Sequence, residues 1–360
     1  MKKLSLAVVC LLVAVACGDS GSGSFDPEAG FSQGSQGELR SLAYAYQPAS
    51  RLVYGYSMNM NMNMSADLDV PEAFDNMTMG VSLAGSIAYD VSAGATDGTV
   101  VISIRPEVTE FSLSEFTVDG EAMPEELTGF DDPAAAGLDE FIPQMTVTLD
   151  AKGDVLAMQV GDVTVPSELL GSFGGSGFSD PSGMGMLSTL FGPELPIEEV
   201  RVGATWTTTD TQDVPFVGEM TVVTHHEIVG EENRDGRDTI IIESVAEMSP
   251  LTMDFADMLK SLQDPSTLAS LGMSADELNM AELEAELFEE MDFDFSMTFD
   301  YDNMATTTWL DYSAGITVAT ESDMDMTMTM KMDSPEGGGD MTMGIGTFIA
   351  MLLIEDGASA

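Results

Sequence analysis

Methionine sulfur is the most abundant reactive group in this chain, which holds 29 methionines in 360 residues. Two segments, 58–64 and 323–332, alternate methionine with polar residues. A period of two places every methionine of a segment on one face of a β-strand. Thioethers suit soft ions such as Cu(I) or Ag(I), and they also form adaptable apolar surfaces. The candidate ligand-lining methionines are Met58, Met60, Met62, Met64, Met324, Met326, Met328, Met330 and Met332.

Three interpretations of these methionines stay open. The first is core packing, because methionine fills irregular gaps. The second is a pliable lining for an acyl chain or another apolar ligand, since ordinary sheets pack with Val, Ile and Phe instead. The third is a soft-metal site. Residues on one face of a strand lie about 6.6–6.8 Å apart, so thioethers converge on an ion only if neighbouring strands contribute.

The two histidines, His225 and His226, are adjacent in the sequence. On a strand they point to opposite faces, so we expect that they do not share one ion. His226 is in phase with the apolar residues Val222 and Ile228, which adds it to the candidate ligand-lining residues.

Two further patterns predict no catalysis. Gly30–Gly34 matches the G-x-S-x-G nucleophile elbow, but that motif needs a preceding strand, and here it lies in a Gly/Ser-rich stretch. Pairs of close carboxylates, such as Asp67 and Asp69 or Asp292 and Asp294, alternate with other residues and lack the spacing of a calcium loop. The sequence therefore predicts a non-enzymatic protein with no catalytic residue, no cofactor and no His/Cys/carboxylate metal site.

The N-terminus has the pattern of an export signal. Lys2 and Lys3 precede a short apolar run that ends in small residues and Cys17. About 13 apolar residues are too few to span a bilayer, which needs roughly 20. A cysteine at this site resembles the bacterial lipobox, which implies cleavage after residue 16, acylation of Cys17 and anchoring to the extracytoplasmic side of a membrane. Ala14 stands where Leu is usual, so plain secretion is the alternative.

Charge and composition limit the classes of partner that the protein can bind. A formal net charge of −51 disfavours nucleic acid and anionic lipid headgroups, so acyl chains on Cys17 would hold the protein to the membrane. Cys10 lies inside the signal, so the mature monomer would form no disulfide. The 44% hydrophobic content predicts a sizeable core. The oligomeric state is not predicted.

We expect a signal peptide at 1–16, an acylated cysteine and flexible tether at 17–38, and a single β-rich domain at 39–356. A weak internal repeat relates halves at about 50–165 and 200–335, because Leu149-Asp150 and Leu310-Asp311 each begin a turn. A two-lobed arrangement that divides near 171–192 is the alternative. Strands are predicted at 52–64, 77–92, 99–105, 144–150, 154–165, 203–210, 216–229, 238–248, 293–301, 305–311, 315–332 and 341–354.

Turns, helices and a lid complete the expected elements. Asp97-Gly98 and Asp235-Gly236 are hairpin signals. Helical periodicity predicts insertions at 251–263 and 275–290, within 251–290. The glycine-rich but apolar segment 169–193 is either a loop docked on the core or a lid over an apolar site. Its candidate lid residues are Phe173, Phe178, Leu187 and Phe191.

The segments Leu195-Pro196 and Val200–Trp206, with the Leu-Asp turns and the methionine strands, resemble a family of bacterial envelope lipoproteins. That family is similar in turn to LolA/LppX-type carriers. The resemblance implies a mainly β fold: a large, curved, half-barrel-like antiparallel sheet with helices packed on its concave side. It also implies a lipid-like ligand in the concavity. The alternatives are a structural or interaction lipoprotein with a fully packed core and, third, a Cu/Ag-binding protein.

Overall fold

The structure is a computed structural model that describes residues 31–68, 76–96, 98–122, 144–150, 155–161, 163–164, 192–214, 218–254, 294–333 and 338–358. Sixteen strands make up the regular structure of these residues. They are β1 Gln36–Arg40, β2 Ser50–Leu68, β3 Asn76–Ala93, β4 Val100–Val118, β5 Glu121–Ala122, β6 Met145–Leu149, β7 Val155–Val160, β8 Val163–Thr164, β9 Val200–Val202, β10 Thr205–Val214, β11 Gly218–Arg234, β12 Arg237–Met248, β13 Leu251–Asp254, β14 Asp294–Asp311, β15 Ile316–Asp333 and β16 Gly339–Ala358.

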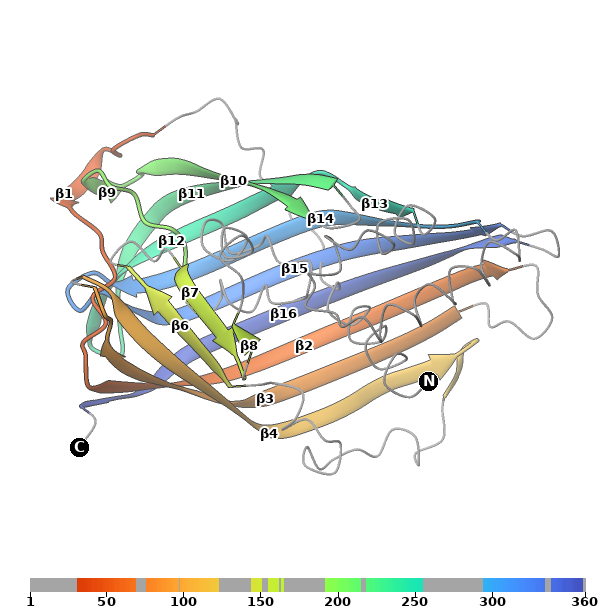
Figure 1. Ribbon diagram of the computed structural model, residues 1–360, viewed down its shortest axis with the longest axis horizontal. Coiled ribbons are helices and arrows are strands. Elements are labelled where there is room, and N and C mark those ends of the chain that lie inside the picture. The colour runs from red at the N-terminus through yellow and green to blue at the C-terminus, as the bar shows by residue number, and fades with distance from the viewer. Residues whose placement is uncertain are drawn as a thin grey trace.

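One large antiparallel sheet contains fourteen of these strands in the order β10-β11-β12-β14-β15-β16-β2-β3-β4-β6-β7-β8. β13 pairs with β14 and β5 with β4, while β1 and β9 form a separate small sheet. The first and last long strands meet in the middle of the large sheet, where β16 pairs with β2 from Gly339 opposite Leu68 to Ala358 opposite Ser50. The long strands lie side by side in Figure 1.

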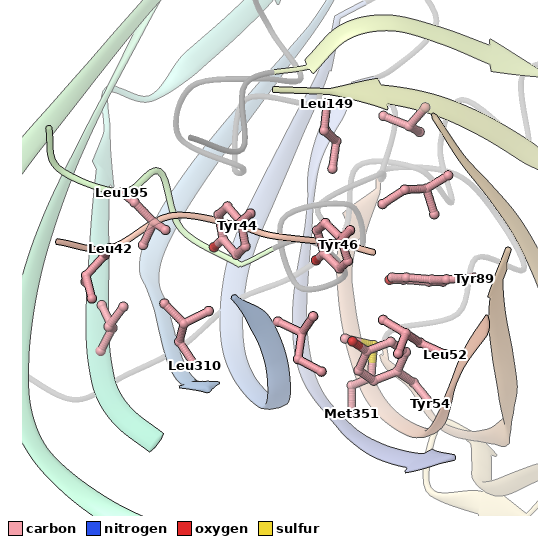
Figure 2. Packing of buried hydrophobic residues seen from close by; sticks show 14 of the residues in the cluster. Leu42, Tyr44, Tyr46, Leu52, Tyr54, Tyr89, Leu149, Leu195, Leu310 and Met351 are labelled. Carbon is pink, nitrogen blue, oxygen red and sulfur yellow. The ribbon is translucent and has the colours of Figure 1, made fainter. Parts of the chain in front are cut away.

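The sheet curls at one end, called here the closed end, where β6 and β7 pass in front of the long strands (Figure 1). Leu149 of β6 and Met158 of β7 share one buried cluster with Tyr54 of β2 and Leu310 of β14. Figure 2 shows Tyr44 and Tyr46 between Leu149 on one side and Leu310 on the other. The curled sheet therefore encloses a core at this end.

Two segments outside the strands, one with Tyr44 and Ala45 and one with Pro193 and Glu194, complete the core at the closed end. Tyr44 donates a hydrogen bond to the carbonyl of Pro193 at 2.8 Å, and Trp206 Nε1 donates one to the carbonyl of Glu194 at 3.0 Å. The amide of Ala45 donates to the carbonyl of Gly315 at 2.8 Å. Gly315 has φ +65°, and a Cβ there would lie 2.5 Å from the Ala45 nitrogen, so only glycine fits this approach.

The mainly β, antiparallel fold predicted from alternation is confirmed, but the helical insertions are not supported. The predicted helix at 251–263 begins as strand β13, which places Leu251 opposite Phe299 and Met253 opposite Met297. Leu251 and Met253 also alternate with period two, and pairing with β14 decided between the two periods. Residues 255–293 lie outside the described residues, and the described part of the chain contains no helix.

Other element boundaries also differ. The predicted strands 293–301 and 305–311 are one strand, β14, with a register shift between Tyr301 and Asn303. β4 continues to Val118, past the predicted end at 105. β1 crosses the expected tether boundary at residue 38. No helix among the described residues is long and apolar enough to span a membrane.

The hairpin turns follow the predicted chemistry. Asp235 and Gly236 have φ of 52° and 84°, as a two-residue turn between β11 and β12 requires. Asp311 ends β14, and its Oδ1 accepts hydrogen bonds from the amides of Ser313 and Ala314, both at 2.9 Å. The side chain of Asp311 thus holds the turn that leads into β15.

Asp311 also joins three strands through Arg237. The guanidinium of Arg237 on β12 lies 3.1 Å from Asp311 and 2.6 Å from Asp356 on β16. Burial raises the pKa of Asp311, but hydrogen bonds from Ala314, Ser313 and Arg237 outweigh burial, so the net pKa is lowered. A lowered carboxyl pKa stabilises the fold above the unfolded pKa, and this contribution is lost as pH falls through the folded value.

We predict that Asp311→Asn lowers the free energy of unfolding by about 1–3 kcal/mol at pH 7, because it removes charge-assisted hydrogen bonds from a buried carboxylate. Asp356→Asn is the matched control, since it removes the exposed carboxylate bound to the same arginine and should cost less than about 1 kcal/mol. Urea denaturation at pH 7 measures both values. Equal losses would show that the buried turn contacts contribute nothing beyond the ion pair.

Candidate functional site

The inner face of the sheet is the face that carries Tyr54, Leu310 and Met351, which pack in the closed-end core. Successive side chains of a strand alternate between faces. The even-numbered residues of β2 from Leu52 to Met64 therefore share the inner face, and so do the even-numbered residues of β15 from Thr320 to Met332. All nine candidate methionines lie on this face.

Strand register aligns the methionines into rows across the sheet, called here the methionine rows. In one row Met328 of β15 lies opposite Met343 of β16, which lies opposite Met64 of β2, which lies opposite Met77 of β3. The next row runs Met253, Met297, Met330 and Met341. A third runs Met326, Ile345, Met62 and Met79. Residues directly opposite each other have Cβ atoms about 4.5–5.5 Å apart.

The methionine rows form a second apolar cluster beyond the closed end. Met324, Met326, Met328 and Met330 are buried, with 2–7% of their surface exposed. Met58, Met60 and Met62 are half-buried and pack against the same cluster. Met64 and Met332 are also half-buried on this face.

Sequence reasoning missed several members of this cluster. Phe299 and Met304 of β14 and Ile345 and Ile349 of β16 are buried in it, and Leu251 joins them from β13. The signal was present, because Phe295-x-Met297-x-Phe299 and Met341-x-Met343-x-Ile345 also alternate with period two. The strands were predicted, but their adjacency to the methionine strands was not.

The opposite face of the same strands is polar. Asn59, Asn61 and Asn63 of β2 are exposed, and Asn59 accepts a hydrogen bond from Ser82 at 2.9 Å. Asp323 and Lys331 of β15 are exposed as well. Two hollows of about 400 and 410 Å³ lie at the closed-end loops and on this outer face, and neither is lined by a methionine of the rows. On β2 and β15 the sheet is thus apolar on the inner face and polar on the outer one, whereas β16 exposes Phe348 and Leu352 on its outer face.

A row of buried polar side chains, the polar belt, separates the methionine rows from the closed-end core. It consists of His226 on β11, Ser244 on β12, Thr306 on β14 and Ser322 on β15, each directly opposite the next. His226 Nδ1 lies 2.8 Å from Ser244 Oγ, and Thr306 Oγ1 lies 3.0 Å from Ser322 Oγ. The polar belt therefore crosses four strands on the inner face.

His226 is fixed within the sheet on three sides. Its ring stacks on Trp206 with centroids 4.9 Å apart, and Nε2 lies 3.0 Å from Thr208 Oγ1. Burial, with a smaller contribution from His225, lowers the pKa of His226 to about 3. The ring is therefore neutral near pH 7, and hydrogen bonds occupy both nitrogens. His226 therefore lies at the edge of the methionine rows as a neutral, fully hydrogen-bonded member of the polar belt.

His225 lies on the opposite face from His226, as the alternation predicts, with Nδ1 3.1 Å from Thr207 Oγ1. Among the described residues no three His, Cys, Asp or Glu side chains gather into a metal site. Soft-metal binding requires thioethers from neighbouring strands to lie close together, because those of a single strand are too far apart. The methionine rows place methionines of neighbouring strands opposite each other.

Several predicted site residues lie outside the described residues. These are Cys17 and the lid residues Phe173, Phe178, Leu187 and Phe191. Their roles stay predictions.

No protein-family model matches the chain, and no curated protein matches it. Among solved structures, lipovitellin aligns over 88% of this chain with 14% identity and a TM-score of 0.36, and the chain spans 26% of that protein's length. An outer membrane channel from Pseudomonas putida covers 86% of this chain and 98% of its own, with 7% identity and a TM-score of 0.20. OccAB4 from Acinetobacter baumannii covers 84% and 98%, with 5% identity and a TM-score of 0.19. Similarity at this level establishes neither a family nor a function.

We predict that His226 makes the fold sensitive to mild acid. The unfolded histidine binds a proton below its ordinary pKa of about 6.5, whereas the folded one resists protonation until about pH 3, so stability falls with pH between these values. Between pH 7.5 and pH 5 the free energy of unfolding falls by about 2 kcal/mol, because it falls by about 1.4 kcal/mol for each pH unit below about 6.5.

Urea denaturation at the two pH values tests this, with His226→Asn as the comparison. The variant is less stable at pH 7.5, because it loses the stacking on Trp206, but its stability should fall less at pH 5. The same pH dependence in both proteins would assign the acid sensitivity to other groups.

Proposed function

We propose that this protein is a lipid-anchored envelope protein that binds a hydrophobic, lipid-like molecule against the methionine rows and catalyses no reaction. One observation carries the proposal: strand register aligns methionines of adjacent strands into continuous rows on a single face. Together they form a broad apolar surface of a kind that suits an acyl chain.

The two ends of the same strands offer an internal comparison. On the inner face of β2, Leu52, Tyr54 and Tyr56 are buried at the closed end, and methionine replaces them from Met58 onward. β14 does not follow this division, because Phe295, Phe299 and Tyr301 accompany Met297 and Met304 in the second cluster. On β2 the chain uses well-defined shapes where its own core is permanent. It uses unbranched, polarizable side chains at the other end, where adaptability to a partner is useful.

Two other functions compete with this one. A fully packed methionine face would make the protein structural, and thioethers on neighbouring strands could instead hold Cu(I) or Ag(I). Native mass spectrometry of protein purified from its own membranes separates them. Bound lipid supports the proposal, bound copper supports the metal-binding function, and a molecule without either supports the structural role.

A direct binding test uses N-phenyl-1-naphthylamine, an uncharged apolar dye that fluoresces when it leaves water. We predict that Met62→Gln with Met64→Gln weakens dye binding about tenfold, because two amides without partners replace apolar groups of similar size. The control is Asn61→Gln with Asn63→Gln, which changes the same strand on its exposed face and should leave binding unchanged.

Melting temperatures of both variants show whether lost binding reflects unfolding. Equal dye affinity in the two double variants would remove the methionine rows as the binding surface. If the unmutated protein does not bind the dye, the proposed function itself fails.

The membrane anchor is tested separately. Cys17→Ser should move the protein from the membrane fraction to the soluble exported fraction, because a chain with a net charge of −51 is repelled by anionic headgroups and needs its acyl chains. Fractionation and the mass of the N-terminal peptide measure this. Membrane retention of the variant, with no acyl mass on the unmutated peptide, would contradict acylation.

A further inference from the structure

We infer that the polar belt receives the polar end of the ligand, and that this ligand is an uncharged amphiphile with a hydrogen-bonding head, such as a monoacylglycerol or a fatty alcohol. This inference rests on the proposed function and makes its ligand class specific. It follows from the position of the belt, from hydroxyls without partners beside it, and from the distribution of charge around it.

The position of the belt matches a molecule with one polar end. Ser322 of the polar belt is followed on the same face of β15 by Met324, Met326, Met328 and Met330. At about 3.3 Å per residue, the methionine-covered part of the strand extends roughly 27 Å from Ser322 to Met330. A long acyl chain can lie along this face with its head at the belt.

Hydroxyl groups beside the belt lack hydrogen-bond partners. Thr308 and Thr320 lie directly opposite each other, one pair closer to the closed end than Thr306 and Ser322. Both are fully buried on the inner face, and their Oγ1 atoms have no hydrogen-bond partner among the described residues. Thr224 of β11, two residues before His226, shares this condition.

An unsatisfied buried hydroxyl costs about 1–3 kcal/mol, so the adjacent pair Thr308 and Thr320 calls for a partner beyond the described residues. Neighbouring belt hydroxyls are paired with each other, which shows that the sheet satisfies such groups where it can. A ligand head with donors and acceptors would satisfy Thr308 and Thr320, and a bound water is the competing partner.

The described residues of the inner face disfavour a charged head. Across the methionine rows, the described inner-face residues of β2, β14, β15 and β16 include no Asp, Glu, Lys, Arg or His. Arg234 lies over the ring of Trp309 at 4.1 Å, and Arg237 is bound by two carboxylates. His226 is neutral because burial lowers its pKa to about 3. A carboxylate or phosphate would be desolvated here without a cation, which is costly.

The test compares two competitors with the same tail, 1-monopalmitoylglycerol and palmitate, for displacement of N-phenyl-1-naphthylamine at pH 7.5. We expect monopalmitoylglycerol to displace the dye from the unmutated protein at a concentration at least tenfold lower than palmitate needs. Thr320→Val, which removes one hydroxyl at constant shape, should weaken monopalmitoylglycerol about tenfold. It should leave dye affinity unchanged and should not lower the melting temperature.

Thr329→Val is the matched control, because Thr329 lies on the outer face of the same strand. It should alter neither competitor. Palmitate that competes as well as monopalmitoylglycerol would overturn the inference. A Thr320→Val protein that is more stable yet binds monopalmitoylglycerol unchanged would also overturn it. That result would mean that the Thr320 hydroxyl of the unmutated protein bonds at most to water and not to the ligand. Dye binding without this head-group preference refutes only the inference, whereas no binding of the dye or of either lipid refutes the proposed function with it.

Discussion

Strand register is the constraint on which the rest of this structure depends. Because side chains alternate between faces, a shift of one residue between β15 and β16 would move Met326 and Met328 to opposite sides of the sheet from Met343 and Ile345. The methionine rows, the polar belt and the closed-end core all require that neighbouring strands keep this register. In β14 the register shift between Tyr301 and Asn303 moves the inner face from odd-numbered to even-numbered residues. The closed end supplies it: the Arg237 contacts to Asp311 and Asp356 and the bond from Tyr54 to the Thr317 carbonyl connect β12, β14, β15, β16 and β2 there.

Fixed register at one end allows adaptable side chains at the other. Tyr54, Tyr89 and Leu310 are fully buried in defined shapes, and the two tyrosines pack with ring centroids 4.9 Å apart. A methionine face alone would specify strand alignment weakly, since unbranched side chains accept many arrangements. The shape-specific core and the pliable face are therefore complementary parts of one sheet rather than two independent features.

Local patterns predicted much of this fold, and long-range pairing accounts for the rest. Alternation at 58–64 and 323–332 predicted which residues share a face, and Asp235-Gly236 predicted a hairpin. Alternation does not reveal that β16 pairs with β2, because that contact joins residues far apart in the sequence, such as Met64 and Met343. The polar belt was missed for the same reason: Ser244 and Thr306 look like ordinary strand residues until pairing places them side by side. Residues 251–254 were predicted as the start of a helix from their helical period, but they form strand β13 because they pair with β14.

The contrast between the methionine rows and the polar belt suggests how one sheet can be tolerant and selective at once. Under the proposed function, thioether side chains would repack around tails of different length or unsaturation and contribute affinity with little discrimination. Buried hydroxyls discriminate strongly, because a head group that leaves them unpaired loses the bonds and gains nothing in return. The described inner-face residues of the methionine rows carry no charge, so under the proposed function an ionised head would find no counter-ion among them. Exposed charges such as Asp323 and Lys331 lie on the outer face of β15, so under the proposed function the inner face would be the favourable place for an apolar chain.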